Sequence, residues 1–160
     1  NLADVGEISS QVQDHFSDQA EQSAFTASFI LGGQIQGQAQ EIFLIYPQGN
    51  HIAASDQKPF LQIGETKYGK PILDRIVASS ITLERGARCA LVSMDASMRS
   101  NLSVGPPIEL LLYNVDSINQ YRALKFEAHD AFLKQIGQAW SDGLNELFYR
   151  LPRFDWESPA

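Results

Sequence analysis

Few of the residue types that commonly perform chemistry occur in this chain, and they are not grouped. Its single cysteine, Cys89, cannot form an internal disulfide or share a metal with a second thiolate. The histidines show no metal-ligand spacing: His15, His51 and His129. Gly32-Gly33 is not followed by the Gly-Lys-Ser/Thr of a phosphate loop. Asp95 has serines nearby but neither a histidine close in sequence nor a nucleophile elbow. Local motifs therefore identify no complete active site.

The composition is that of one globular domain, and it argues against two classes of partner. A length of 160 residues suits a single domain over 1–160, and 44% hydrophobic with 19% charged residues is ordinary. Twelve Lys and Arg against 19 Asp and Glu give a net charge of -7. Nucleic-acid binding needs clustered basic residues, and membrane spanning needs an apolar run of ~18–20 residues. We expect neither partner.

Cys89 occurs among apolar residues with helical spacing, so we predict a buried core thiol on a helix. An unpaired cysteine also fits a reducing compartment, and we expect a cytoplasmic protein.

Hydrophobic periodicity predicts a helix followed by a run of strands. Apolar residues from Leu2 to Phe16 recur at helical spacing, whereas 25–31 alternates with the period of a strand. A second strand at 42–46 would form a hairpin with the first, and Pro47-Gln48-Gly49 suits a type I turn. Two short strands are predicted next, at 51–54 and 60–63.

The second half of the chain predicts two helices, two strands and a last helix. Gly64-Glu65-Thr66 would turn the chain into the first helix, with Pro71 near its start, and Thr82 would cap the second. Strands follow at 108–113 and 121–126. The last helix begins near Asp130, and its apolar face is predicted to be buried: Leu133, Ile136, Trp140, Leu144, Leu147 and Phe148.

This order groups helices and strands instead of alternating them singly, which favours an α+β fold with antiparallel sheets covered by helices. Several strands are apolar on both faces. Two sheets stacked between helical layers would explain that pattern.

An ordered series of motifs resembles proteasome-type subunits. The segments read FILGG at 29–33, IFLIYPQG at 42–49, QIGETKYGKPILDRI at 62–76 and ALVSMDASMRSNLSVGPPIELLLY at 90–113. Together they resemble the ancestral-beta-subunit family, known as Anbu, among the N-terminal-nucleophile hydrolases. The resemblance extends from the first predicted helix to about Phe154.

The resemblance implies a four-layer helix-sheet-sheet-helix fold and a threonine-type peptidase. In such enzymes an N-terminal Thr, Ser or Cys attacks the peptide carbonyl, and its own α-amino group serves as the base. Asn1 cannot be that nucleophile. We therefore expect the first strands of the fold, and the nucleophile with them, to be missing from this chain.

Two pairs of residues match supporting positions of such a site. Glu65 or Thr66, depending on the alignment of the turn, occupies the place of a Ser that hydrogen-bonds near the nucleophile's amine. A carboxylate there would be stabilised by a helix N-terminus and could accept a proton from an ammonium; the alternative is an ordinary first-turn acid. Ser103 keeps a hydroxyl of the family, and Ser100 replaces an Asp, which bacterial relatives replace by Thr. The alternative for Ser103 is a turn residue that bonds its own backbone.

The resemblance also implies a structural cation, although no cofactor is required. In some bacterial relatives, carbonyl oxygens near the end of the helix that matches the one predicted after Thr82 hold a small cation. The matching carbonyls are those of Met94, Ser97 and Ser100, at the negative end of the helix dipole. The alternative is that water caps them.

We therefore expect the wall and assembly portion of a self-compartmentalising peptidase that acts on peptides or unfolded proteins and forms homo-oligomers. By itself this part of the chain would not be an enzyme. The alternatives are a catalytically silent ring subunit of the same fold, an amidase of the same hydrolase class, and an unrelated α+β binding module.

Overall fold

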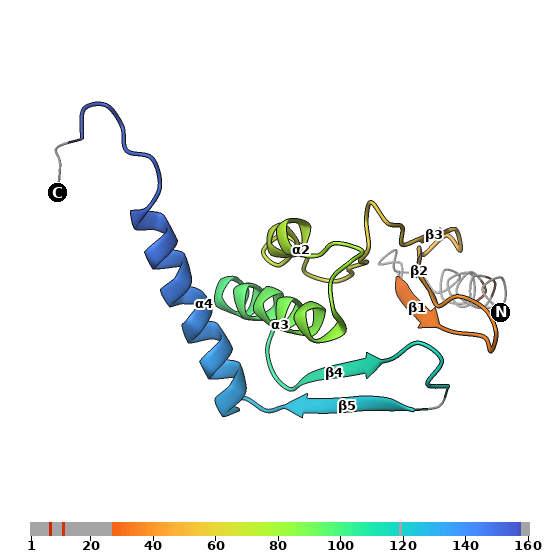
Figure 1. Ribbon diagram of the computed structural model, residues 1–160. Coiled ribbons are helices and arrows are strands. Elements are labelled where there is room, and N and C mark those ends of the chain that lie inside the picture. Colours follow the sequence, from red (N-terminus) through yellow and green to blue (C-terminus); the bar gives the residue numbers. More distant parts are fainter. Residues whose placement is uncertain (1–6, 8–10, 12–26, 119, 158–160) are drawn as a thin grey trace, which may run out of the picture.

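The computed structural model describes residues 7, 11, 27–118 and 120–157. These residues form two small antiparallel sheets and three helices with described bounds, an α+β arrangement (Figure 1). The elements are β1 (Phe29–Gly33), β2 (Glu41–Ile45), β3 (His51–Ala53), α2 (Lys70–Ile76), α3 (Leu83–Ser100), β4 (Ile108–Tyr113), β5 (Tyr121–Phe126) and α4 (Ala131–Tyr149). The helix predicted at the start of the chain lies outside the described residues, except for Glu7 and Gln11, which are helical.

The first sheet has the order β1-β2-β3 and confirms the predicted hairpin. Phe29 pairs with Ile45 in β1 and β2, and Ile45 pairs in turn with His51 of β3. The turn between β2 and β3 closes where the Gly49 N–H donates to the Tyr46 carbonyl at 2.9 Å. Gly49 has a φ of 84°, a left-handed conformation that glycine adopts without a Cβ clash.

The strand predicted at 60–63 is wrong. After β3 the chain folds back through a bridge between Ser55 and Lys58, and the described residues offer 60–63 no strand to pair with. The Phe60 ring instead lies 5.7 Å from the Lys70 ammonium. Alternating apolar residues predict a strand only when a partner edge is within reach, and the periodicity carries no information on that.

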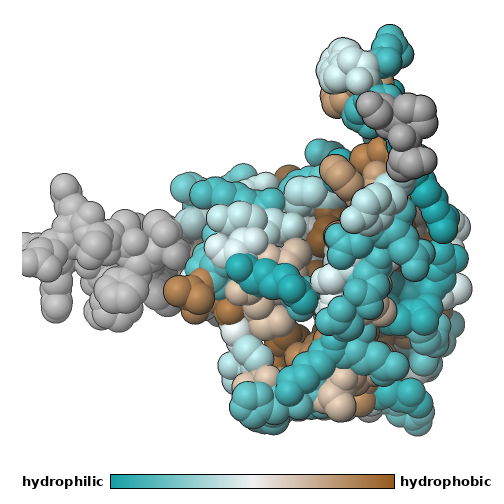
Figure 2. Space-filling model, turned by 90° about the vertical axis from the view of Figure 1, so that its left-hand side faces the viewer, coloured by the Kyte–Doolittle hydropathy of each residue, from teal (hydrophilic) through white to brown (hydrophobic). Residues whose placement is uncertain are grey.

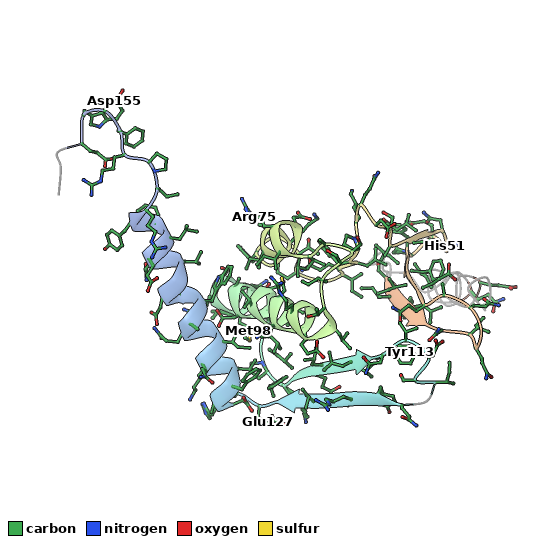
Figure 3. All side chains as sticks on the ribbon, in the orientation of Figure 1. His51, Arg75, Met98, Tyr113, Glu127 and Asp155 are labelled. Atoms are coloured by element: carbon green, nitrogen blue, oxygen red, sulfur yellow. The ribbon has the colours of Figure 1, made fainter. Side chains whose placement is uncertain are left out.

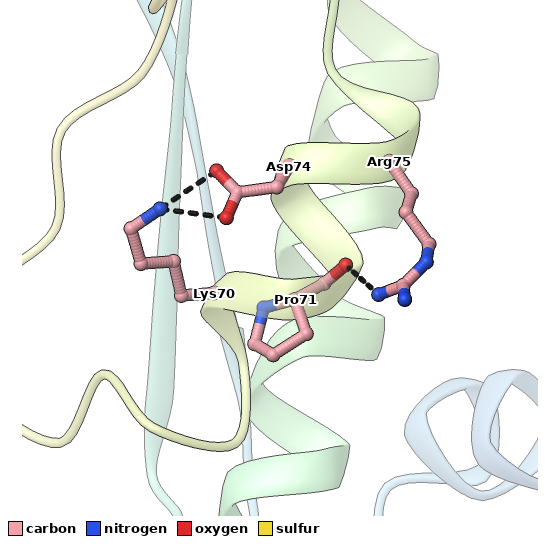
Figure 4. A network of polar contacts seen from close by, with 4 residues as sticks. All are labelled: Lys70, Pro71, Asp74 and Arg75. Atoms are coloured by element: carbon pink, nitrogen blue, oxygen red, sulfur yellow. Dashed lines mark hydrogen bonds and ion pairs between the residues drawn. The ribbon is translucent and has the colours of Figure 1, made fainter.

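Helix α2 begins at Lys70, a turn later than the sequence suggests, with Pro71 in its first turn. Lys70 contacts both carboxylate oxygens of Asp74 at 2.6 and 2.7 Å, and Arg75 donates to the Pro71 carbonyl at 2.9 Å (Figure 4). These pairs are exposed, so each contributes little to the free energy of unfolding. Leu73 is the buried residue of this helix.

Helix α3 and the β4–β5 hairpin enclose the main core. Thr82 caps α3 as predicted, accepting the Arg85 N–H. Leu91 of α3 packs against Ile108 of β4 and Phe126 of β5. Partly buried side chains surround this cluster, including Met98 (Figure 3): Met94, Met98, Leu110, Leu133 and Ile136. Cys89 is buried on α3, which confirms the predicted core thiol.

The side chain of Gln34 links the two sheets. The side-chain oxygen Oε1 of Gln34, just after β1, accepts hydrogen bonds from the Tyr113 hydroxyl and the Asp116 N–H, both at 2.8 Å. Its amide nitrogen donates to Asp116 Oδ1 at 2.7 Å and to the Gln38 carbonyl at 2.9 Å. The amide is therefore saturated, and β1 is tied to the turn after β4.

Helix α4 crosses α3 at one end of the molecule (Figure 1). The helix begins next to Asp130, as predicted, and Asp130 caps it by accepting the Phe132 and Leu133 N–H groups at 2.8 and 3.2 Å. The crossing is close at Gly137, where a Cβ would lie 2.6 Å from Asp95 Oδ1. Beyond it, the predicted burial is wrong: Leu144, Leu147 and Phe148 are 47%, 57% and 72% exposed. The described residues place no element against that half of the helix.

None of the described helices is long and apolar enough to cross a membrane.

Candidate functional site

The turn before α2 and the loop after α3 meet at a three-residue polar network. The Asn101 side chain donates from Nδ2 to Glu65 Oε2 at 3.0 Å. Its Oδ1 accepts the Ser103 hydroxyl at 2.7 Å and the Ser103 N–H at 2.9 Å. Two of the predicted site residues, Glu65 and Ser103, are thus joined through Asn101, although 36 residues separate Asn101 from Glu65 in sequence.

Local sequence explains how the turn reaches α3. Gly64 has a φ of 79°, a left-handed conformation that glycine adopts readily, and the chain turns there just before Glu65. Gly69 lies directly against α3: a Cβ there would overlap Ser93 Oγ and lie 3.0 Å from the Ser93 carbonyl oxygen. Because residue 69 has no side chain, the turn can approach the buried surface of α3 and bring Glu65 to the loop that follows this helix.

Asn101 is well placed to hold the loop because it ends α3. Its backbone is extended, and its N–H donates to the Ser97 carbonyl at 2.9 Å. The Oδ1 contact with the Ser103 N–H is the Asx turn that asparagine commonly forms. Only the amide nitrogen of Asn101 can face the Glu65 carboxylate, so its oxygen must face Ser103. The Ser103 hydroxyl therefore acts as a donor to Asn101 and keeps its lone pairs for a third group.

Glu65 is held in its ionised form. The Lys67 backbone N–H, 3.0 Å from Oε1, and the Asn101 amide together lower the pKa of the Glu65 carboxyl below its usual value. Both contacts are donors to a carboxylate, which favours the charged state. Glu65 and Ser103 can thus both accept hydrogen bonds from a group that binds beside them, and Glu65 adds a negative charge.

The other two candidates lie outside this network. Thr66 accepts the Lys70 N–H through its backbone carbonyl at 3.0 Å, which helps to start α2. Ser100 is exposed at the last position of α3. No side-chain hydrogen bond of either residue to another described residue is seen. The sequence did not single out Asn101. The signal that could have found it is an asparagine between two candidate serines, Ser100 and Ser103, at the end of a predicted helix.

The three carbonyls of the predicted cation site all belong to the last two turns of α3. Ser97 is buried; its hydroxyl donates to the Ser93 carbonyl at 3.0 Å, and its own carbonyl accepts the Asn101 N–H. A carbonyl oxygen has a second lone pair, so this bond does not prevent metal binding. The donor set consists of hard oxygens, which suits Mg²⁺ or Ca²⁺. The described residues contain no cluster of His, Cys, Asp and Glu with metal-binding geometry.

A cleft of about 810 Å³ separates the two sheets, away from the polar network. Gly32, Gly33 and Ile42 line it from the first sheet, and Leu111, Tyr113 and Tyr121 from the second. Its walls contain neither Glu65 nor Ser103. In the segment before Glu65, Gln62 Oε1 is buried and has no hydrogen-bond partner among the described residues.

His51 of β3 packs edge-on against Phe43, with ring centroids 5.8 Å apart, and is exposed, as is His129. His15 lies outside the described residues.

Comparison with known proteins identifies relatives by structure. No protein-family model matches the chain, and no curated protein is significantly similar to it. Among solved structures, Anbu from Yersinia bercovieri is 38% identical, with a TM-score of 0.88, over 96% of this chain and 64% of that one. The helical assembly of the Anbu complex from Pseudomonas aeruginosa is 44% identical, with a TM-score of 0.91, over 97% and 65%. An Anbu mutant from Hyphomicrobium sp. strain MC1 is 41% identical, with a TM-score of 0.89, over 96% and 64%.

These similarities place the fold with the proteasome-like beta subunits of the N-terminal-nucleophile class. The predicted resemblance is confirmed: this chain is a relative of the Anbu, or ancestral beta-subunit, proteins. It spans about two thirds of their length, 64–65% of each matched chain. An unrelated α+β binding module does not fit identities of 38–44% over nearly the whole chain.

Proposed function

We propose that this chain is part of a self-assembling threonine-type peptidase subunit that works in the cytoplasm. The N-terminal nucleophile would come from a segment outside the chain. The kinship with Anbu proteins supports this proposal, and the observation that carries it is the network of Glu65, Asn101 and Ser103.

The chemistry of the network suits the amine of an N-terminal nucleophile. When the hydroxyl attacks a peptide carbonyl, its proton passes to the α-amino group, which becomes an ammonium. An ionised Glu65 and the lone pairs of Ser103 would accept N–H bonds from that ammonium and stabilise its charge. The ammonium then donates this proton to the leaving amine as the peptide C–N bond breaks, and a water molecule hydrolyses the ester that remains on the nucleophile. Asn101 acts through the other two residues and is a positioning residue.

A peptidase assay on the full-length protein tests the proposal. Wild type should cleave a fluorogenic peptide. Glu65→Gln and Ser103→Ala should each lower kcat about tenfold to a hundredfold, because each removes one acceptor of the ammonium, whereas a group that itself transfers the proton contributes about 10²–10⁴-fold. Glu84→Gln is the control, because Glu84 is an exposed acid in the first turn of α3 and lies outside the network.

The sizes of the assembled particles should be compared alongside the rates. A wild type that assembles but cleaves no peptide would replace this proposal with the silent ring subunit. Cleavage of small amides without cleavage of peptides would indicate an amidase. Equal rates for wild type, Glu65→Gln and Ser103→Ala would remove the network from the mechanism.

We also infer the four-layer arrangement for the complete subunit. Two separate antiparallel sheets are present, and in the described residues β4 and β5 each pair with only one strand. About one third of the chain of each of these relatives has no counterpart here. Strands from such a segment would extend both sheets across the cleft between them. Helices α2 and α3 would then form one outer layer (Figure 1).

The cation at the end of α3 is a separate proposal. The carbonyls of Met94, Ser97 and Ser100 would bind Mg²⁺ or Ca²⁺ and fix the loop that carries Asn101 and Ser103. Either cation should then raise the melting temperature, because a ligand at 100 times its Kd stabilises by about 2.7 kcal/mol. Thermal melts in chelator, with each divalent ion added back against a NaCl control of equal ionic strength, measure this. Identical melts would leave water as the cap.

A further inference from the structure

The loop after α3 begins with a tight turn that has two side chains at its tip. The Val104 N–H donates to the Asn101 carbonyl at 3.1 Å, which closes a turn whose two central residues are Leu102 and Ser103. The Asn101 side chain holds the same turn from within, because its Oδ1 accepts the Ser103 N–H and hydroxyl. Residue 102 is therefore fixed between two neighbours that are hydrogen-bonded to each other.

Leu102 is the most exposed of the large apolar residues in the described part of the chain, at 102%. The end of α3 and the loop after it lie on the side of the molecule that Figure 2 presents, where most of the visible surface is hydrophilic. Single exposed leucines are common on protein surfaces, so exposure alone assigns no role to Leu102. What distinguishes it is the residue with which it shares the turn.

Leu102 is adjacent to a group that would hold the reacting amine. In the proposed function, the Glu65 carboxylate and the Ser103 hydroxyl accept hydrogen bonds from the ammonium of the nucleophile. Consecutive Cα atoms are ~3.8 Å apart, so Leu102 and Ser103 leave the tip of the turn about one residue from each other. An amine bound to Ser103 thus has the apolar side chain of Leu102 as its neighbour.

The path of the proton determines which part of a substrate meets this side chain. The ammonium protonates the nitrogen of the leaving peptide, so that nitrogen must come within hydrogen-bond reach of the amine. The first residue of the leaving peptide carries this nitrogen. An extended peptide advances only ~3.3–3.6 Å per residue, which places the side chain of that first residue, and not those of later ones, nearest to the turn.

We propose that Leu102 is a specificity-determining residue that contacts the first residue of the leaving peptide and favours an apolar side chain there. This inference rests on the proposed function, because it requires the amine to bind at Glu65 and Ser103. The negative charge of Glu65 would repel an acidic side chain at the same place. The fixed turn supports the role, because a residue that is already ordered loses little entropy when a substrate contacts it.

A series of internally quenched peptides tests the assignment on the full-length protein. The peptides share one acyl part and have leucine, glycine or glutamate as the first leaving residue, with the cleaved bond located by mass spectrometry. Wild type should cleave the leucine peptide with a kcat/KM at least about tenfold above that of the glycine peptide, since even one methylene in an apolar contact is worth about 10–200-fold. The glutamate peptide should be the slowest.

Substitutions at residue 102 separate a contact with substrate from a role in holding the loop. Leu102→Ala should lower kcat/KM for the leucine peptide about tenfold and leave the glycine peptide unchanged, because glycine has no side chain to contact. Leu102→Met should retain most of the preference, since the two side chains have similar volumes. Val115→Ala is the control: Val115 is 59% exposed in the turn at the opposite end of β4, and its loss should change no rate.

The outcomes distinguish this inference from the function on which it rests. Equal losses on the leucine and glycine peptides in Leu102→Ala would show that Leu102 only shapes the loop, and would overturn the inference. Equal wild-type rates for the two peptides would overturn it as well, and the peptidase would stand. A wild type that cleaves no peptide of the series would overturn the proposed function and this inference with it.

Discussion

At the scale of single residues, the central feature is an amide that holds a carboxylate and a hydroxyl in fixed orientation. Asn101 has one donor and one acceptor directed at Glu65 and Ser103, and the reverse orientation would place two oxygens against each other. Ser103 is therefore more than a turn residue bonded to its own backbone, the alternative that its sequence context allows. It shares its partner with a charged group from another element.

The lowered pKa of Glu65 predicts a specific pH dependence of stability. The folded state stabilises the ionised carboxyl of Glu65 more than the unfolded state does. Its contribution to the free energy of unfolding is therefore present above the unfolded pKa of about 4.3 and is lost as pH falls through the lower, folded pKa. Glu65→Gln and Asn101→Ala should both flatten the loss of stability on acidification. Urea unfolding at a series of pH values from about 6 to about 3 measures the slope.

The exposed Glu84 provides the comparison for that titration. Glu84→Gln removes one carboxylate outside the network of Glu65, Asn101 and Ser103, so it controls for the loss of a negative charge alone. An unchanged slope for Glu65→Gln would mean that the unfolded chain holds the carboxyl as well as the native turn does.

At the scale of elements, the approach of the turn before α2 to α3 depends on the absence of a side chain at residue 69. Gly69→Ala would force the new Cβ against Ser93, and overpacking of this kind typically costs about 1–3 kcal/mol. The added Ser93→Ala should recover part of that loss by removing the hydroxyl. Chemical denaturation of the single and double variants gives both values.

The control for this substitution lies on α4. A Cβ on Gly143 would meet no atom within 4 Å, so Gly143→Ala should stabilise the helix by up to about 1 kcal/mol. Equal effects at 69 and 143 would mean that helix propensity, and not the contact with Ser93, dominates.

The elements also show what the sequence can predict. Thr82, Asp130 and strand β4 were predictable because caps and apolar runs act locally. The strand at 60–63 failed because pairing needs a distant edge, and Leu147 was predicted buried because periodicity defines a face but not what covers it. The family motifs indicated Glu65 and Ser103. The link through Asn101 was not predictable, because it exists only where the end of α3 meets a turn 36 residues upstream.

At the scale of the whole molecule, little apolar surface is fully enclosed. Seven apolar residues of the described part are buried: Ile45, Leu73, Cys89, Leu91, Val92, Ile108 and Phe126. Many more large apolar side chains of the described residues are exposed, and they concentrate on β1, on the second sheet, and on the second half of α4 with the tail after it. A chain of this kind gains stability when other surfaces cover it.

The melting temperature of the full-length protein should therefore rise with protein concentration, because association adds stability by mass action. Calorimetry over a hundredfold range of concentration makes the measurement. A melting temperature independent of concentration in wild type would indicate that each subunit covers its own apolar surface.

The tight crossing at Gly137 has a geometric consequence for the exposed end of α4. From Gly137 to Tyr149 the helix extends ~18 Å, at ~1.5 Å per residue, so it acts as a lever about the crossing. A tilt of about 5° there displaces the tip by roughly 1.5 Å over that length. A methyl group on one buried glycine, pressed against Asp95, would thus move every side chain on the exposed end of the helix.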